Sequence, residues 1–217
     1  MARSNLAAIS AGIVMCMAQP VRAESFFQVE LGLGAGAATD GDGIWVQKQG
    51  VPHEQKTVTP AMVAGISAGL YRHDGFDIRG RLDYTWFGQD SVSCMCVSDA
   101  AYAARDYAAP KNYFYGFGHT QGVSLMAEIG YSYRGWRFSA EAGPWINWST
   151  WREYDNTPWG PDHPVHNTSP SLGYVAGVGV ERGNLGIHYR YYSVKQSWNP
   201  YPGVVTGAHL LYMQYRF

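Results

Sequence analysis

The last strand expected from the sequence reads His209-Leu210-Leu211-Tyr212-Met213-Gln214-Tyr215-Arg216-Phe217. Successive side chains of a strand point to opposite faces. One face therefore carries an apolar and aromatic set, namely Val205, Gly207, His209, Leu211, Met213, Tyr215 and Phe217. The other face is mixed and includes Gln214 and Arg216. A strand of about ten residues with one apolar, aromatic-ended face has the pattern needed to cross a lipid bilayer.

Seven further segments alternate in the same way. The eight lie near residues 25–36, 60–72, 76–88, 121–133, 136–149, 171–182, 185–196 and 204–217. Three connections are short and carry turn residues, namely His73-Asp74-Gly75, Arg134-Gly135 and Gly183-Asn184. The connections 37–59, 89–120 and 150–170 are long, and 197–203 is intermediate. This asymmetry predicts an all-β fold: an eight-stranded antiparallel up-and-down transmembrane β-barrel with short periplasmic turns and long extracellular loops.

The two faces of these strands differ in charge. Almost no charge falls on the face assigned to lipid, whereas the inner face collects six acids, five arginines and one histidine. A barrel of eight strands is narrow, so these charges must pair inside it. We expect a network centred on Arg79, Arg81, Arg190, Glu128 and Glu141, with Glu181 and His188 on the same face. The network either fills the barrel or lines a narrow pore.

The first 23 residues have the features of a cleaved secretory signal. They contain a basic start at Arg3, an apolar run and a Val21-Arg22-Ala23 cleavage sequence. The expected mature domain is residues 24–217, which hold 14 basic and 17 acidic residues, a net charge of −3. That balance gives no electrostatic reason to expect a nucleic-acid partner.

In its architecture the chain resembles the small bacterial outer-membrane barrels of the OmpA transmembrane-domain and OmpX type. The resemblance implies a Gram-negative outer-membrane location, among outer-membrane lipid and lipopolysaccharide. It also implies that the barrel-assembly machinery reads the terminal aromatic residue Phe217. Pro144 departs from a regular strand, because a proline on the lipid side of the fifth strand removes a hydrogen bond between strands.

The stretch Arg190-Tyr191-Tyr192-Ser193 is faintly similar to the end of the outer-membrane lipid A deacylases, which place a His-x-Ser pair on a strand. Tyr191 stands at the histidine position here. If the 197–203 connection pairs Tyr191 or Ser193 with His209, then Ser193 and His209 lie on the lipid face of adjacent strands, about 5 to 8 Å apart, as a substitute nucleophile and base. No orienting acid is evident on this face. The alternative is that both are polar residues at the membrane interface.

The long connections carry cysteines and aromatic residues. Cys94 and Cys96 can form a strained disulfide in an oxidising compartment, and two thiols are too few for a metal site, so we expect neither metal nor cofactor. The aromatic residues indicate either a contact surface or packing among the loops. They are Tyr102, Tyr107, Tyr113, Phe114, Tyr115 and Phe117 in one loop and Trp151, Tyr154 and Trp159 in the next.

Three functions fit these observations. The leading one is a structural or adhesion-like outer-membrane protein whose loops contact a host or envelope surface. The second is a lipid A-modifying hydrolase that uses Ser193 and His209, and the third is a narrow, porin-like pore.

Overall fold

The structure is a computed structural model that describes residues 27–40, 53–56, 58–97, 101, 104–106, 108–109, 111–157, 160–162, 165–167, 169–194 and 205–217. The expected signal segment lies outside the described residues. Within these ranges, no helix has the length and apolar character to cross a membrane. The strands are β1 (Phe27–Asp40), β2 (His53–Lys56), β3 (Val58–His73), β4 (Phe76–Phe87), β5 (Asp90–Val97), β6 (Lys111–Tyr133), β7 (Trp136–Thr157), β8 (Gly160–Asp162), β9 (Val165–Asn167), β10 (Ser171–Arg182), β11 (Leu185–Ser193) and β12 (Val205–Arg216).

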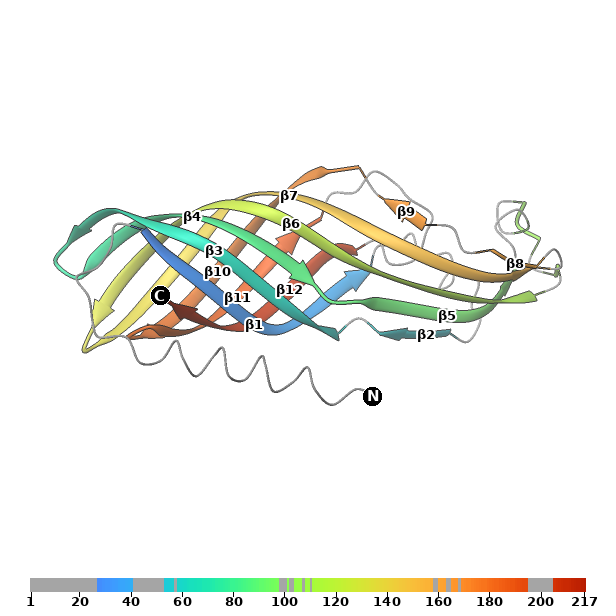
Figure 1. Ribbon diagram of the computed structural model, residues 1–217, viewed down its shortest axis with the longest axis horizontal. Helices are drawn as coiled ribbons and strands as arrows, with labels where there is room; N and C mark the ends of the chain where they lie inside the picture. The colour runs from blue at the N-terminus through green and yellow to red at the C-terminus, as the bar shows by residue number, and fades with distance from the viewer. Residues whose placement is uncertain are drawn as a thin grey trace.

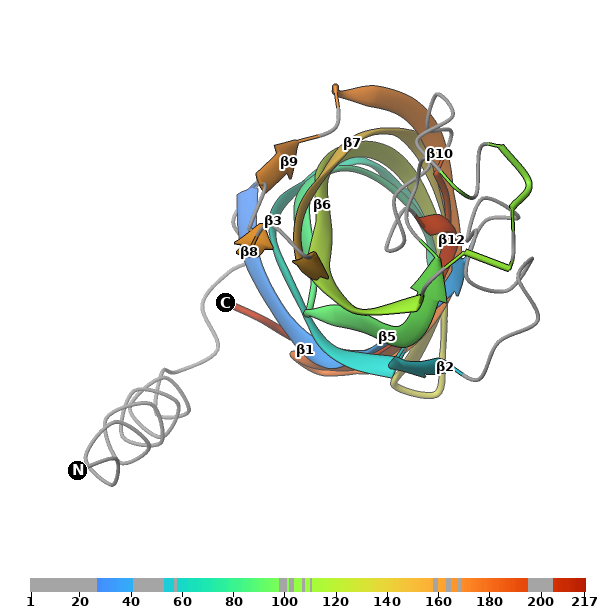
Figure 2. The same ribbon diagram turned by 90° about the vertical axis from the view of Figure 1, so that its right-hand side faces the viewer.

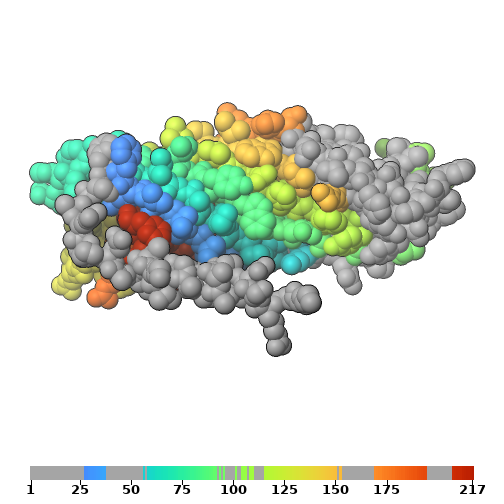
Figure 3. Space-filling view, in the orientation of Figure 1, coloured from blue at the N-terminus to red at the C-terminus, as the bar shows by residue number. Residues whose placement is uncertain are grey.

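Eight of these strands form a closed antiparallel ring in the order β1-β3-β4-β6-β7-β10-β11-β12. The ring closes where β1 pairs with β12, from Glu30 opposite Arg216 to Ala38 opposite Ala208. Figure 2 shows the ring end-on, and Figure 3 shows the surfaces of β1 and β12 side by side. The expected eight-stranded up-and-down barrel is confirmed.

Three two-residue turns join neighbouring strands at one end of the barrel, here called the turn end. Asp74 and Gly75 have φ values of 49° and 81°, and Arg134 and Gly135 have 50° and 80°. Turns with both φ values positive match the right-handed twist of the strands they join. The third turn, Gly183-Asn184, has its glycine at φ 61°. These turns set the register of three of the hairpins.

Burial alternates along the strands as the sequence predicts. Charged side chains point into the barrel, whereas large apolar side chains remain exposed on its outer face. Exposed residues of the middle band include Leu33, Ile66, Leu82, Leu125, Ile146, Val178, Ile187 and Leu211. Exposed aromatic residues of the turn end include Tyr71, Tyr131, Tyr133, Trp136 and Phe217. A closed barrel with an apolar outer band and aromatic rims is a membrane-spanning fold.

The two central strands are longer than predicted. The expected strands 121–133 and 136–149 are observed as β6, which begins at Lys111, and β7, which ends at Thr157. Pairing between them continues to Phe114 opposite Asp155, well past the last barrel contact of β4 with β6, Trp86 opposite Gln121. β5 pairs with β6 along this extension, and β2 pairs with β5. Part of each expected long loop is therefore an ordered sheet, at the right of Figure 1.

Pro144 interrupts pairing without shifting the register. β6 and β7 pair at Ser124–Trp145 and again at Ala127–Ala142, and no pairing is formed between these positions. Both pairs belong to the same register, so the strand contains no bulge. A proline cannot donate to the neighbouring strand, which explains the break.

Candidate functional site

Arg81 is the first centre of the charges inside the barrel. Its Nη1 donates a hydrogen bond of 2.6 Å to Glu128 Oε2, and its Nη2 lies 2.6 Å from Glu30 Oε2. Nη2 also donates to Asp83 Oδ2 at 3.1 Å and to Gln214 Oε1 at 2.8 Å. Arg81 is only 1% exposed. A buried guanidinium of this kind is tolerated because carboxylates surround it.

Arg190 is the second centre. Its Nε and Nη2 donate to the two oxygens of Glu141 at 2.6 and 3.0 Å, which is a bidentate arrangement. Nη2 also donates to Asp83 Oδ2 at 2.7 Å, so Arg81 and Arg190 share this carboxylate. The guanidinium carbon lies 5.1 Å from the ring centre of Tyr212. The two centres form one connected lumen network.

The lumen network continues to the turn end through two further arginines. Arg137 Nε and Nη2 donate to the oxygens of Asp77 at 2.8 and 2.6 Å. Arg216 Nη1 and Nη2 donate to Glu181 at 2.9 Å each. His188 Nε2 lies 3.4 Å from the same Glu181, and its ring stacks on Tyr212.

Arg79 does not lie at the centre where the sequence predicted it. Its Nε lies 3.1 Å from Asp77 Oδ2, and its Nη1 donates to Gln28 Oε1 at 3.4 Å. The Arg79 side chain is 15% exposed, whereas that of Arg81 is fully buried, so Arg79 lies at the edge of the network. The other predicted members lie together inside the barrel: Arg81, Glu128, Glu141, Glu181, His188 and Arg190.

The half of the lumen nearer the long loops is aromatic. Phe87, Trp145 and Tyr192 form an aromatic plug whose ring centres lie 4.7 to 6.1 Å apart. Trp145 and Tyr192 have no exposed surface, and Leu210 beside them has none either. The sequence could have identified the plug, because Phe87, Trp145 and Tyr192 lie on the same face of their strands as the inward-facing charges.

These two layers close the lumen. Arg81, Arg190, Trp145 and Tyr192 are at most 1% exposed. The wall of an aqueous channel must be in contact with water, and these side chains are not. The described interior of the barrel therefore favours the filled-barrel alternative over the narrow pore.

Ser193 and His209 do not contact each other. Tyr191, not Ser193, stands opposite His209, and Ser193 pairs with Gly207. His209 Nδ1 lies 2.6 Å from Tyr189 Oη, and the His209 ring packs between Tyr189 and Tyr191. Among the described residues no carboxylate contacts His209. The structure thus places both residues on the outer face without forming a nucleophile–base hydrogen bond.

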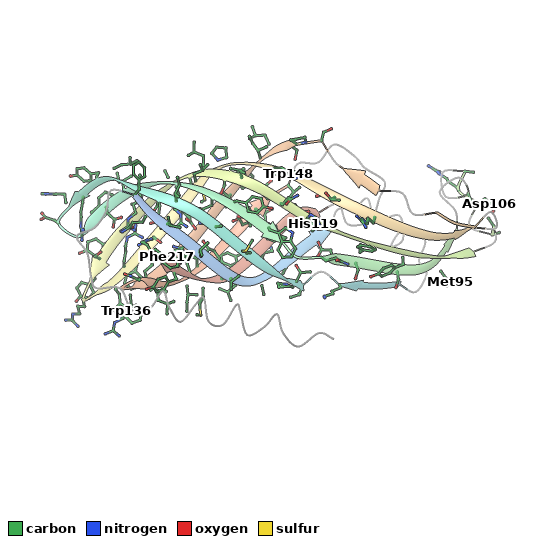
Figure 4. All side chains as sticks on the ribbon, viewed as in Figure 1. Met95, Asp106, His119, Trp136, Trp148 and Phe217 are labelled. Atoms are coloured by element: carbon green, nitrogen blue, oxygen red, sulfur yellow. The ribbon has the colours of Figure 1, made fainter. Side chains whose placement is uncertain are left out.

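The extension of β5, β6 and β7 beyond the barrel, together with β2, is here called the projecting sheet. Its outward face carries Met95, Tyr115, Phe117 and His119, of which Met95 is 51% exposed. The rings of Tyr115 and Phe117 lie 5.7 Å apart, and His119 lies 6.2 Å from Trp86 at the rim of the barrel. These four residues, here called the outer strip, continue the lipid-facing surface onto the projecting sheet, to the right in Figure 4.

Several predicted loop residues, or their side chains, lie outside the described part of the chain. Cys94 and Cys96 belong to β5, but their side chains lie outside the described residues, as do those of Tyr113, Phe114, Trp151 and Tyr154. Tyr102, Tyr107 and Trp159 lie outside them entirely. In the described part of the chain, no group of three or more metal-ligating side chains is found.

No family model and no curated protein matches the sequence. Among solved structures, the chain is similar to Neisserial surface protein A, with 17% identity, a TM-score of 0.43 and coverage of 90% of this chain and 100% of that one. It is similar to Ail, the attachment invasion locus protein of Yersinia pestis, with 13% identity, a TM-score of 0.43 and coverage of 89% and 100%. For the outer membrane enzyme PagL the values are 12%, 0.37, 88% and 98%. Similarity at this level transfers no activity or ligand to this chain.

Proposed function

We propose that this protein is an outer-membrane surface protein whose closed barrel carries the projecting sheet as an adhesion-like contact surface. The observation that supports this most is the continuous pairing of β6 and β7 beyond the barrel, as far as Phe114 opposite Asp155. Because β6 is paired with β5 on one side and with β7 on the other, this region is an ordered sheet rather than an irregular loop. Among the described residues, the barrel interior offers no comparable accessible site.

The outer strip is suited to contact. Tyr115, Phe117 and Met95 present apolar surface, and Ser91 and Ser93 stand directly opposite Phe117 and Tyr115 on β5. Aromatic rings flanked by hydroxyl groups suit both sugar rings and protein surfaces, because they combine apolar stacking area with hydrogen-bonding groups. The partners that fit this surface are lipopolysaccharide sugars and a host or envelope surface.

The test is attachment of bacteria that display the protein. Cells with the unmodified protein should bind epithelial monolayers or immobilised lipopolysaccharide better than cells without it. The double variant Tyr115→Ser/Phe117→Ser should lose most of this gain, since a few buried aromatic residues dominate contact energies. Tyr71→Ser is the matched control, because it removes an exposed tyrosine from the turn end. Equal attachment by all variants, at equal surface display, would refute the proposal.

Export and assembly belong to the same proposal. Residues 1–23 would be removed as the signal, and Phe217 would be read by the assembly machinery. The position of Phe217 supports this role, since its ring is 46% exposed beside Tyr215 at the turn end. Phe217→Ala should lower the amount of folded protein in the membrane fraction. An unchanged amount would contradict that role for Phe217.

A further inference from the structure

The three tight turns form one arc around the turn end of the barrel. The first two are neighbours, because Ser132 N donates a hydrogen bond of 2.7 Å to Gly75 O. The second and third are neighbours because β7 pairs with β10 as far as Arg137 opposite Glu181. The three turns therefore lie together at one end of the barrel, at the left of Figure 1.

An exposed arginine accompanies each turn: Arg72 precedes the first, Arg134 lies in the second and Arg182 precedes the third. The guanidinium of Arg134 lies 5.1 Å from the ring centre of Tyr133. That of Arg182 lies 5.2 Å from the ring centre of Trp136. Stacking on an aromatic face fixes the guanidinium plane and leaves its N–H edges available to an acceptor.

Arg134 has a backbone conformation that does not suit an arginine. Its φ of 50° lies in the left-handed region, which long side chains rarely adopt. The first turn follows the usual preference, with Asp74 at φ 49° in the equivalent position. A disfavoured residue at a tight turn points to a role for its side chain rather than for the turn.

The surrounding aromatic residues indicate where these arginines lie relative to the membrane surface. Tyr131, Tyr133 and Trp136 are between 42% and 53% exposed at this end of the outer face. Tyrosine and tryptophan in such a belt lie at the level of the lipid headgroups. Phosphate groups lie at the same level, and a guanidinium recognises phosphate through paired N–H donors. The exposed carboxylate of these turns, Asp74, lies 3.2 Å from His73.

We propose that the turns form an arginine–aromatic girdle that binds the phosphate groups of anionic glycerophospholipids in the periplasmic leaflet. Arg134 and Arg182 supply the charge, and Tyr133 and Trp136 hold the two guanidinium groups in place. The girdle requires only that the barrel lies in a bilayer. It does not depend on the role proposed for the projecting sheet, which lies at the opposite end of the molecule.

The test is lipid retention by the full-length folded protein. The protein is placed in neutral detergent micelles containing equal amounts of phosphatidylglycerol and phosphatidylcholine, and bound lipids are counted by native mass spectrometry. The unmodified protein should retain phosphatidylglycerol in several-fold excess. Arg134→Asn and Arg182→Gln should each reduce that excess, by roughly fivefold for a basic residue at an anionic lipid surface.

Two features of the design separate binding from folding. Asparagine suits a positive φ, so Arg134→Asn should fold as well as the unmodified protein, which a comparison of heated and unheated samples on a denaturing gel checks. Arg105→Gln is the matched control, because Arg105 is an exposed arginine next to Asp106, which lies beyond the barrel at the end opposite the turns (Figure 4). No excess of phosphatidylglycerol on the unmodified protein would overturn the proposal. An unchanged excess in both variants, or an equal loss in Arg105→Gln, would overturn it as well.

Discussion

The charged and aromatic halves of the lumen are lined by the same strands but are filled in different ways. Toward the turns, arginines and carboxylates meet at 2.6 to 3.5 Å, with Arg81 and Arg190 at the centre. Toward the long loops, Phe87, Trp145 and Tyr192 pack ring against ring. Both halves are closed to water, but by different forces.

The difference predicts how the stability of each half responds to the substitution of one of its residues. A salt-bridge network depends on every member, because removing one leaves its partners charged and buried. An aromatic plug loses contact area and gains a cavity, which neighbouring side chains partly fill. The turn-end half should therefore be the more sensitive half, even though its interactions are polar.

Arg81→Met should have the largest effect. The change leaves Glu30, Asp83 and Glu128 with less positive charge in a buried site, and we expect a loss of about 5 kcal/mol in the free energy of unfolding. Urea unfolding in lipid vesicles measures it. Asp74→Asn, which neutralises an exposed acid, should change stability by less than about 0.5 kcal/mol. A loss for Arg81→Met as small as that of this control would contradict the dependence on every member.

Trp145→Ala should destabilise the barrel by about 3 to 4 kcal/mol, because it removes a fully buried aromatic side chain. The charged half of the lumen, nearer the turn end, is unchanged in this variant. Planar bilayers with this variant should therefore remain without conductance steps, as with the unmodified protein. Steps that appear in Trp145→Ala would show that the plug alone closes the lumen.

Tyr192→Phe should cost about 1 kcal/mol in the same unfolding measurement. It keeps the ring but removes a hydroxyl that lies 3.0 Å from Thr85 Oγ1 and accepts a hydrogen bond from Arg190 at 3.2 Å. Tyr192 is the point where the two halves meet. If the loss approaches that of Arg81→Met, the plug and the network act as a single unit.

Ser193→Ala should have the smallest effect, within about 0.5 kcal/mol, since Ser193 lies on the outer face. Lipid A from cells with this variant should keep the same acyl chains as lipid A from cells with the unmodified protein. A difference in acyl chains between these two lipid A samples would support the hydrolase hypothesis, even though His209 contacts Tyr189 rather than Ser193.

The barrel was predictable because alternation and turn chemistry are local. β10 has the predicted bounds, Ser171 to Arg182, and the tight turns lie where Asp74-Gly75 and Arg134-Gly135 predicted them. The projecting sheet was missed because residues 111–120 contain no aliphatic residue, and the run Tyr113-Phe114-Tyr115 breaks the alternation of aromatic with small or polar residues. Such a pattern without long aliphatic residues does not distinguish a strand above the membrane from a loop.

The lumen was predictable only in part. The sequence identifies which charges face inward but not their height in a tilted, staggered barrel, so Arg79 was placed too near the centre. The aromatic plug was missed because Trp145 and Tyr192 are as well suited to the lipid interface as to a core. The distance between Ser193 and His209 depended on cross-strand register, which pairs His209 with Tyr191.

The junction of β1 with β12 has a consequence for how the protein forms. Phe217 N donates a hydrogen bond of 2.9 Å to Val29 O, and Arg216 Nε donates one of 2.8 Å to Glu30 Oε1. These partners stand almost 190 residues apart, so bringing them together costs more chain entropy than forming any of the hairpins. Closure should therefore be the last and slowest step of assembly, and until then both free strand edges are open to pairing with another chain.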